Sequence, residues 1–412
     1  MSLFVVKSGV GDVFWCAFQV QSPSLRAQQL LPRLKHRTFD TLDDTKMVKD
    51  STKDDRKSEN IQFEPEIVWH NVLLFVILHT GGFWGLWRLM TFQLSILTFI
   101  WTLAVAFVSV EGMMVGSHRF FCHRAFKANT WFKLLTVVTQ TMAGQNCIYI
   151  WTRDHRLHHK YSDTDADPHN SKRGFFFCHM GWLLQRKHPM VKLMGKNIDM
   201  SDLEAEPLVM FQKKYYYLLY AVFSVGIPAM VPVYFWGESV SNAFLSPYFM
   251  RYMLTLHGTW TINSFAHKYG YRPYSKDIQP VESEFVAFIS SGEGWHNFHH
   301  SFPWDYRAGE FGKRWNLSSH IVDWFASIGW AYDLKCASPE MVKYRVNKRG
   351  DGTHSSFQRE KYDDTDDSTV KQKMKTLLED QSHSKFGEDD SEDIFGEKIS
   401  SEGFNILNRA IA

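Results

Sequence analysis

The chain has 412 residues and a formal net charge of only +2, from 46 basic and 44 acidic side chains. This balance, without a basic stripe interleaved with aromatic residues, argues against a nucleic-acid partner. The length alone would suit two or three soluble domains, but polar ends enclose a middle region rich in Phe, Trp and Tyr. The five cysteines show no paired spacing, which predicts a reducing compartment for the polar parts.

Both ends of the chain are polar. Residues 35–65 are dense in Lys, Asp, Arg, Thr and Ser and bury too little apolar surface to fold alone, so we predict that residues 1–65 form a disordered cytosolic extension. Clustered Asp and Glu near the other end predict that residues 351–412 form a disordered acidic tail. Residues 66–350 are the predicted folded domain.

Four apolar runs in this domain are long enough to cross a bilayer, which needs about 20 helical residues. The runs are residues 67–89, 92–115, 215–236 and 244–262. The segments between and after the two pairs are rich in Lys and Arg, so the positive-inside rule places them in the cytosol. We therefore predict an all-α membrane protein, with four transmembrane helices under a cytosolic helical cap and both termini cytosolic. The alternative is a soluble all-α protein with buried core helices.

A further apolar run, residues 131–151, carries polar residues such as Lys133, Gln140 and Gln145. This mixture is typical of a helix that lies at the membrane surface, so we predict an interfacial helix and not a fifth span. Membrane lipid is accordingly an expected partner.

The spacing of the histidines indicates a metal-binding site. His155, His158 and His159 occupy positions i, i+3 and i+4, so on an α-helix their imidazoles can converge on one locus. The same offsets recur later, and two further pairs complete the pattern. These are His296, His299 and His300, then His118 with His123, and Asn263 with His267. The nine histidines exceed what one ion can hold, so two metal ions sharing the set is the economical interpretation, against chance clustering on surface helices.

His118 and His123 differ in spacing from the other motifs. Residues five apart are turned by about 140° on a straight α-helix, so these two share a face only if the helix ends between them. We therefore predict that the second span ends near Arg119.

The motifs His-Arg-Phe-Phe-Cys-His, His-Arg-Leu-His-His and His-Asn-Phe-His-His resemble the three histidine boxes of membrane-bound fatty-acid desaturases. Flanking segments narrow the resemblance to animal acyl-CoA desaturases of the stearoyl-CoA Δ9 type. These segments are Gln-Asn at 145–146, Arg-Asp-His at 153–155, Ala-Asp-Pro-His-Asn at 166–170, Arg-Lys-His-Pro at 186–189, Gly-Tyr-Arg-Pro-Tyr at 270–274 and Gly-Glu-Gly at 292–294. The resemblance covers residues 66–354 and is specific, because box spacing and flanks agree together.

This resemblance implies a di-iron centre that uses dioxygen to remove two hydrogens from a saturated fatty acyl-CoA in the endoplasmic reticulum membrane. Electrons would come from cytochrome b5 and its NADH-dependent reductase. Zinc, which has no redox chemistry, would be inert in this role. The implied catalytic and metal-binding residues are His118, His123, His155, His158, His159, His267, His296, His299 and His300, with Asn263 acting on one metal through a water. How these ligands divide between the two ions is left open.

The resemblance also implies substrate contacts. Residues matching positions that bind the CoA head group are Asn146, Arg153, Asp154, Arg186 and Lys187. Trp260 matches a tryptophan that lines the acyl tunnel. Cationic residues beside anionic lipid, and a tryptophan packed in a core, are the alternative interpretations.

Four carboxylates are placed to orient ligating imidazoles, namely Asp154, Asp163, Asp167 and Glu293, although each could equally be a surface charge or a helix cap. Rival functions are desaturation at another position, hydroxylation on the same histidine scaffold and, outside enzymes, metal transport. Transport is weakly supported, since transporters need polar ligands at mid-membrane and these histidines lie in cytosolic segments.

Two polar residues within the spans depart from the family pattern. Glu111 lies seven residues before His118, and His257 lies six before Asn263, so both would sit roughly 10 Å below the metal level. A lone charge at this depth costs about 2.5 to 3.5 kcal/mol. The hypothesis is that Glu111 and His257 pair beside the acyl tunnel, and the alternative is two independent polar residues with different neighbours.

Overall fold

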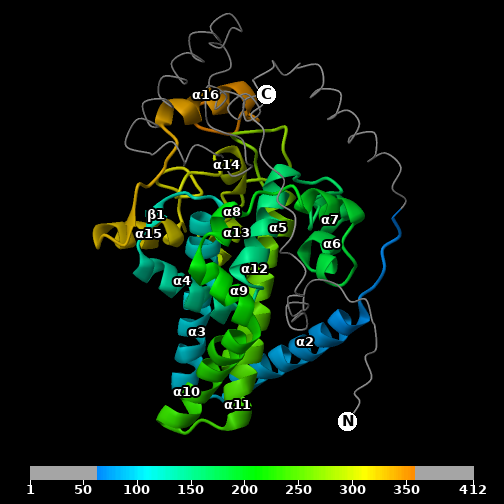
Figure 1. The fold of residues 1–412 in the computed structure, drawn as a ribbon, viewed down its shortest axis with the longest axis vertical. Helices are drawn as coiled ribbons and strands as arrows, with labels where there is room; N and C mark the ends of the chain where they lie inside the picture. Colours follow the sequence, from blue (N-terminus) through cyan, green and yellow to red (C-terminus); the bar gives the residue numbers. More distant parts are fainter. Residues whose placement is uncertain (1–62, 358–412) are drawn as a thin grey trace, which may run out of the picture.

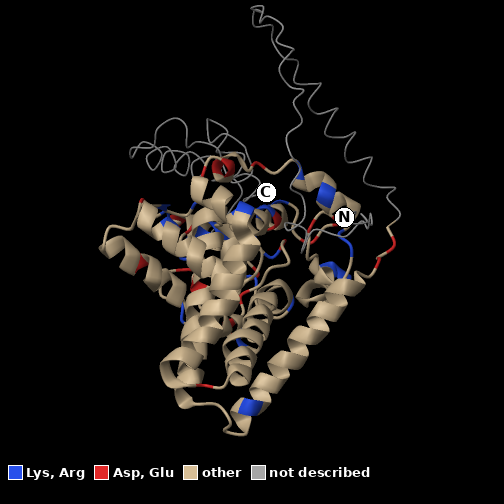
Figure 2. Cartoon of the chain, turned by 60° about the horizontal axis from the view of Figure 1, so that its bottom comes forward, with Lys and Arg blue, Asp and Glu red and all other residues tan. Residues whose placement is uncertain are grey.

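The computed structural model describes residues 63–357 (Figure 1). Most of the predicted extension and tail, residues 1–62 and 358–412, lies outside the described residues, so the predicted disorder there and the domain limits remain predictions. Long helices form one end of the molecule and short helices form a cap at the other (Figure 1). Figure 2 shows that Lys, Arg, Asp and Glu gather in the cap, whereas the long helices carry few of them.

Three helices among the described residues are long and apolar enough to cross a membrane. The first is α2, Trp69–Met90. The second is α3, Ile96–Glu111, continued as the π-helix η1, Gly112–Cys122. The third is α9, Pro207–Tyr220, continued through the π-helix η4, Ala221–Gly226, into α10, Ile227–Trp236. Three of the predicted apolar runs are thus confirmed as helices, with the second extended to Cys122 and the third begun at Pro207.

The fourth predicted run lies in a continuous helical stretch of three pieces. These are α11, Val240–Phe244, the π-helix η5, Leu245–Met250, and α12, Arg251–Ser264. This stretch does not belong to the three apolar helices above. Its composition explains why, because it includes Arg251 and His257 together with several Ser, Thr and Asn residues.

Arg251 is buried and fully hydrogen-bonded. Its Nε donates to the Pro247 carbonyl, and its two terminal nitrogens donate to the Ser109 hydroxyl, the Met142 carbonyl and both oxygens of Ser224. All five N–H groups of the guanidinium therefore have acceptors, which offsets much of the cost of burying the cation. The side chain joins α12 to α3, η4 and the end of α4, Thr130–Ala143.

At the opposite end from the cap, Glu238 joins the start of α3 to the start of α11. Its carboxylate accepts hydrogen bonds from the Ser95 amide at 3.1 Å, the Thr98 hydroxyl at 2.7 Å and the Asn242 side chain at 3.0 Å. Gly85 lets α2 approach η5 closely, because a Cβ there would lie 2.3 Å from the Leu245 carbonyl oxygen. The long helices thus form one packed unit.

The predicted single helix over residues 131–151 is wrong, because the structure divides this run into two helices. α4 ends at Ala143, and Gly144 follows in the left-handed region with φ of 74°, a common helix stop. The next helix, α5, spans Ile148–Lys160 and carries the first histidine triplet. The break allows α5 to take its own direction toward the centre of the cap.

The rest of the cap consists of short elements. The helices are η2 Ser171–Arg173, α6 Phe175–His179, η3 Gly181–Leu183, α7 Pro189–Gly195, α8 Ser201–Glu204, η6 Phe265–His267, α13 Glu284–Ile289, α14 His296–Ser301, α15 Leu317–Ser327 and α16 Pro339–Arg349. Strands β1, Lys127–Ala128, and β2, Ala331–Tyr332, pair antiparallel with Lys127 opposite Tyr332. This ladder joins the end of the second long helix to the last third of the fold.

Candidate metal centre

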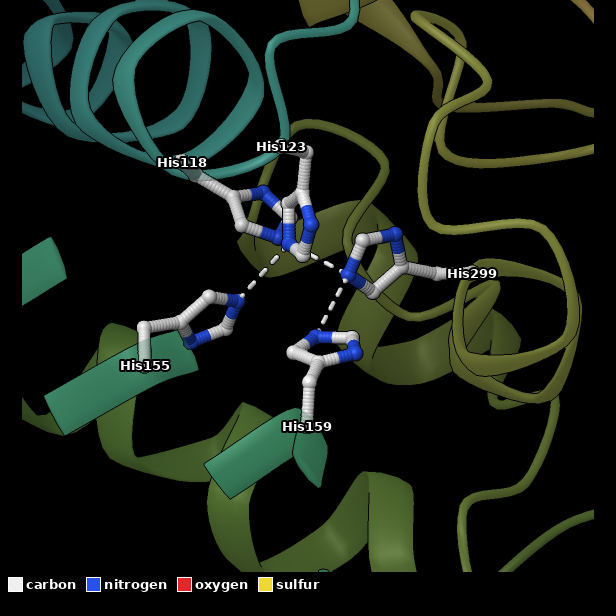
Figure 3. Close-up of side chains that lie close together, drawn as sticks. All are labelled: His118, His123, His155, His159 and His299. Atoms are coloured by element: carbon white, nitrogen blue, oxygen red, sulfur yellow. Dashed lines mark hydrogen bonds between the residues drawn. The ribbon is translucent and has the colours of Figure 1, made fainter. Parts of the chain in front are cut away.

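The nine predicted histidines form two groups, in each of which the ligand atoms lie within 4.8 Å of one another. The five-histidine group contains His118, His123, His155, His159 and His299 (Figure 3). The four-histidine group contains His158, His267, His296 and His300. The two groups adjoin, since the rings of His159 and His300 stack at 4.1 Å. The structure therefore supplies the division of the histidines that the sequence left open.

The π-helix η1 brings His118 and His123 together. The His123 amide donates to the His118 carbonyl at 3.1 Å, an i to i−5 bond, and the two rings lie 4.8 Å apart. Such bonds widen each turn, so residues five apart come to overlie one another. The predicted helix end near Arg119 is therefore wrong, because the helix widens and continues to Cys122.

The two triplets divide reciprocally between the groups. From α5, the i, i+4 pair His155 and His159 joins the five-histidine group and His158 joins the other. From α14, His296 and His300 join the four-histidine group and His299 joins the first. The prediction that each triplet contributes to both positions is confirmed, since helical spacing sends i+3 to a neighbouring stripe.

The inner nitrogens of the five-histidine group converge. Nε2 of His299 lies 2.9 Å from Nε2 of His118 and 3.0 Å from Nε2 of His159, and the Nε2 atoms of His123 and His155 are 3.1 Å apart (Figure 3). Burial lowers the pKa of His123, His155 and His159 well below the usual range, and neighbouring imidazoles reinforce this. Neutral imidazoles with converging lone pairs are the form that binds metal ions.

Carboxylates support the outer nitrogens of three histidines. Asp167 lies 2.9 Å from Nδ1 of His158, Asp163 lies 3.2 Å from Nδ1 of His267, and Glu293 lies 3.0 Å from Nδ1 of His118. A carboxylate at Nδ1 keeps the proton there and leaves Nε2 to a metal. Nε2 of His267 is buried and has no hydrogen-bond partner within residues 63–357, as expected of a ligand atom. The residues present therefore fit metal ions in both groups.

The predicted contacts with imidazoles are confirmed as hydrogen bonds for Asp163 and Asp167 and as an ionic contact for Glu293, and the prediction is wrong for Asp154. Asp154 contacts Lys187 at 2.6 Å and Arg153 at 3.0 Å. These cations lower the pKa of Asp154, although burial opposes them. Its place directly before His155 on α5 turns its side chain to a different side of the helix, toward the cations.

Glu293 is also paired with a cation. Nε and a terminal nitrogen of Arg119 donate to Oε1 of Glu293 at 3.2 and 2.9 Å, and both side chains are 1% exposed. Burial would raise the pKa of Glu293, but His118 and Arg119 outweigh it and lower the pKa to about 2. The carboxylate is therefore charged at neutral pH.

Sequence reasoning missed His169. It forms a third potential metal-binding group with His158 and Asp167, and its ring lies 4.4 Å from that of His158. Its amide donates to Asp167 at 3.0 Å. The available signal was its position in Ala-Asp-Pro-His-Asn, but this segment is a loop, where no helical spacing relates His169 to the other histidines.

The predicted CoA-binding residues are only partly brought together. Arg153, Asp154 and Lys187 form one cluster. Arg186 points elsewhere, since its Nε contacts Glu66 at 2.8 Å and its side chain is 52% exposed. Asn146 has φ of 73° and lies before α5, where its carbonyl accepts from Gln140. These roles stay predictions.

Trp260 and Asn263 both lie on α12. Trp260 is 2% exposed and stacks on Phe75 with ring centroids 5.6 Å apart. Asn263 is half-buried, one helical turn before His267. The tunnel contact of Trp260 and the water-mediated role of Asn263 remain predictions.

The hypothesis that Glu111 and His257 pair is wrong. Glu111 accepts a hydrogen bond from the Ser318 hydroxyl at 2.8 Å. His257 contacts His79 at 3.1 Å and His179 at 3.0 Å. Equal depth along two helices does not make two side chains face each other, and the alternative of two independent polar residues holds.

Membrane-length apolar helices beneath two groups of buried and partly buried imidazoles define a helical membrane protein with a histidine-built site capable of holding metal. The sequence profile described as "Fatty acid desaturase" matches residues 94–317. Similar proteins include the acyl-CoA Delta-9 desaturase of Acheta domesticus, 49% identical over 71% of this chain and 81% of that protein. The acyl-CoA Delta-12 desaturase of Tribolium castaneum is 47% identical over 74% and 86%, and the stearoyl-CoA desaturase of Homo sapiens is 46% identical over 71% and 80%.

The chain therefore belongs to the fatty acid desaturase family. The three relatives named above are acyl-CoA desaturases, and this chain is accordingly an acyl-CoA desaturase, which is an oxidoreductase. The similar proteins include both Delta-9 and Delta-12 enzymes, so family membership does not fix the position of the double bond.

Proposed function

We propose that this protein is an oxygen-dependent desaturase that introduces a cis double bond, at Δ9, into saturated fatty acyl-CoA. The observation that carries this proposal is the pair of adjoining histidine groups, with carboxylates behind three of the imidazoles. The choice of Δ9 is supported by the Delta-9 and stearoyl-CoA desaturases among the similar proteins.

Two iron ions, held by the five- and four-histidine groups, would supply the oxidising power of dioxygen for removing two hydrogens from adjacent methylene carbons. The overall balance is one dioxygen, two electrons and two protons, with the two substrate hydrogens leaving in two waters. Cytochrome b5 and its NADH-dependent reductase would supply the electrons. Asn263 would act on one metal position through a water.

The chain's own residues prepare this site. Asp163, Asp167 and Glu293 set the ring orientations of His267, His158 and His118 from behind. Burial keeps water away and holds most of the imidazoles neutral. The side chains therefore need little rearrangement when metal binds, which favours a fixed geometry.

The CoA head group would lie over the cationic surface near α5. Lys187 donates a hydrogen bond to Asp154 at 2.6 Å, and Arg153 donates to the same carboxylate. These two cations and one anion together have a formal net charge of +1. The Arg186 pair with Glu66 is exposed, and such pairs are worth about 0 to 1 kcal/mol. The contact with Glu66 is therefore only a small obstacle to phosphate binding by Arg186. The acyl chain would pass Trp260.

The proposed topology has four spans in the endoplasmic reticulum membrane, the fourth being α11 to α12, with the cap and both termini in the cytosol. Its support is the length of the fourth helical stretch, whose pieces have 5, 6 and 14 residues, and the complete hydrogen bonding of Arg251. The gathering of charged residues in the cap agrees with this orientation (Figure 2).

A reconstituted assay tests the proposal. The iron-loaded protein, with cytochrome b5, its reductase, NADH and stearoyl-CoA, should form the cis-Δ9 product. His299→Ala should abolish turnover, whereas His320→Ala, whose side chain is 76% exposed and outside both groups, should leave it unchanged. A hydroxylated product would contradict desaturation.

The second candidate is the same chemistry at Δ12, which the Tribolium castaneum relative favours. In the same assay, monounsaturated acyl-CoA would then be converted to a diene while stearoyl-CoA stays unchanged.

A further inference from the structure

Three histidines outside the metal centre form a continuous chain of contacts. His79 of α2 meets His257 of α12 through their Nε2 atoms at 3.1 Å, and Nδ1 of His257 meets Nε2 of His179 of α6 at 3.0 Å. Nδ1 of His179 then meets the Ser264 hydroxyl at 2.9 Å. We call these four residues the His79–Ser264 chain.

Each end of the His79–Ser264 chain contacts a backbone carbonyl oxygen. Nδ1 of His79 lies 2.6 Å from the Phe75 carbonyl, and the Ser264 hydroxyl lies 2.8 Å from the Trp260 carbonyl. A carbonyl oxygen accepts hydrogen bonds and never donates them. The chain must therefore supply every hydrogen for its five contacts.

Counting hydrogens shows a deficit. Each neutral imidazole brings one N–H, so the three histidines bring three hydrogens, and the Ser264 hydroxyl brings a fourth. Five contacts need five hydrogens. When all three imidazoles are neutral, one contact therefore has no hydrogen, and the lone pairs of its two atoms face each other. One added proton, shared among the imidazoles, gives every contact its hydrogen, and a second would have no contact to fill.

Within the described residues, no carboxylate acts on His257 to balance the positive charge of that proton. Within residues 63–357, the titratable groups that act on His257 are His79 from α2 and His179 from α6, and no acidic or guanidinium group adds to them. The three histidines make further ring contacts with Phe75 and Phe83 of α2, Phe175 of α6 and Trp260. Burial lowers the pKa of His179, against the opposing effect of the Trp260 carbonyl. The hydrogen-bond count therefore favours the protonated form of the His79–Ser264 chain, whereas burial favours the neutral form. Because the two effects oppose each other, the proton can be both gained and lost.

The His79–Ser264 chain contacts Trp260 through two histidine rings and through the Ser264 hydroxyl. The indole meets the His257 ring edge-on at 5.0 Å and the His179 ring edge-on at 5.8 Å, while Phe75 stacks on it at 5.6 Å. Ser264 bonds the Trp260 carbonyl and also contacts His179. When Nδ1 of His179 carries no hydrogen, the hydroxyl has one hydrogen for both contacts, and the added proton removes this competition. Gain or loss of the proton therefore changes the charge beside the Trp260 ring and, through Ser264, the hydrogen bonding of the Trp260 carbonyl.

We propose that His79, His257 and His179 share one proton and, with the Ser264 hydroxyl as their hydrogen-bond partner, position Trp260, so that the acyl-chain preference of the enzyme depends on whether this proton is bound. The preference rests on the proposed function, in which Trp260 borders the acyl chain. The shared proton rests on the contacts alone. His79, His179 and His257 are positioning residues, since they act through Trp260.

The first test follows Trp260 without requiring activity. The full-length protein, labelled with 5-fluorotryptophan and loaded with redox-inert zinc, is studied by fluorine NMR, and Trp260→Phe assigns the resonance. In the unmodified sequence the resonance should move along a one-proton curve that spans about two pH units. His257→Phe should flatten the curve, and His257→Asn should do the same if the Phe variant misfolds.

Thr255→Val is the matched control. It removes a buried polar group from the same helix, whose hydroxyl donates only locally to the Tyr252 carbonyl at 3.1 Å, and it should titrate like the unmodified sequence. A Trp260 resonance that is constant between pH 4 and 8, or that titrates equally in His257→Phe, would overturn the shared proton.

The second test uses the iron-loaded enzyme with equal amounts of palmitoyl-CoA and stearoyl-CoA. The ratio of the two unsaturated products should shift with the same midpoint as the fluorine signal, and should be constant in both His257 variants. A constant ratio alongside a titrating Trp260 overturns the effect on preference. Absence of any unsaturated product contradicts the proposed function while the fluorine result still decides the shared proton.

Discussion

Replacing Glu293 by Gln should both destabilise the fold and weaken metal binding. The carboxylate accepts two hydrogen bonds from Arg119 through Oε1, and its Oε2 lies 3.0 Å from Nδ1 of His118. Both ionic partners are almost completely buried. Gln keeps the size of the side chain, but it leaves the guanidinium without a counter-charge and weakens the support behind His118.

The cost follows from the pKa of Glu293, which falls from 4.5 to about 2 in the fold. A difference of about 2.5 units at about 1.36 kcal/mol each is about 3 kcal/mol, within the range of about 3 to 5 kcal/mol for breaking a buried pair. The folded pKa is depressed, so this stabilisation is complete above about pH 4.5 and is lost as pH falls toward 2. The difference between the two proteins should therefore narrow in acid.

The assay combines thermal unfolding of the metal-free protein in detergent, the state to which this pKa applies, with the iron content of the loaded protein by mass spectrometry. At pH 7, Glu293→Gln should lose about 3 kcal/mol of stability and bind metal 10- to 100-fold more weakly, the usual range for such a supporting partner. Adding Arg119→Met should recover stability, because the unpaired cation is gone, but should not recover metal affinity. Unchanged stability and affinity in Glu293→Gln at pH 7 would refute the reasoning.

Three further predictions follow from the same contacts. His158→Ala should lower the iron content per chain more than Asn263→Ala, whose proposed link is through water, and equal losses would contradict that assignment. Reversing Arg186 and Lys187 to Glu should raise the apparent KM for acyl-CoA and reduce its salt dependence, whereas an unchanged KM would show that they do not bind the head group. Arg251→Met should lower the unfolding temperature and the yield of monodisperse protein, because five hydrogen bonds joining four segments are lost, and an unaltered profile on size-exclusion chromatography would argue against that role.

Much of the metal centre could be predicted because it depends on helix geometry. The offsets i, i+3 and i+4 in α5 and α14 determine which histidines share a stripe, and the structure uses those stripes. The spacing of His118 and His123 predicted the wrong helix end, because residues five apart diverge on an α-helix and this segment is a π-helix. Apolar patterning does not reveal a local change to π-helical bonding, which η1 adopts where it packs against α4.

Contacts between segments were harder to predict. Rise per residue gave Glu111 and His257 similar depths, but their directions depend on how the helices pack, which sends Glu111 to Ser318. Lys187 and Asp154 pair across 33 residues, a contact that no local pattern encodes. His169 lies in a loop, where spacing carries no geometric meaning.

The central claim is that this chain desaturates saturated acyl chains at Δ9. The most direct measurement is expression in a yeast that lacks its own desaturase, followed by chromatography of the fatty acids with location of the double bond. We predict growth without added unsaturated fatty acids and products with a cis-Δ9 bond, both absent with His299→Ala. A correctly expressed protein that yields no unsaturated product, or a double bond at another position only, would contradict the claim.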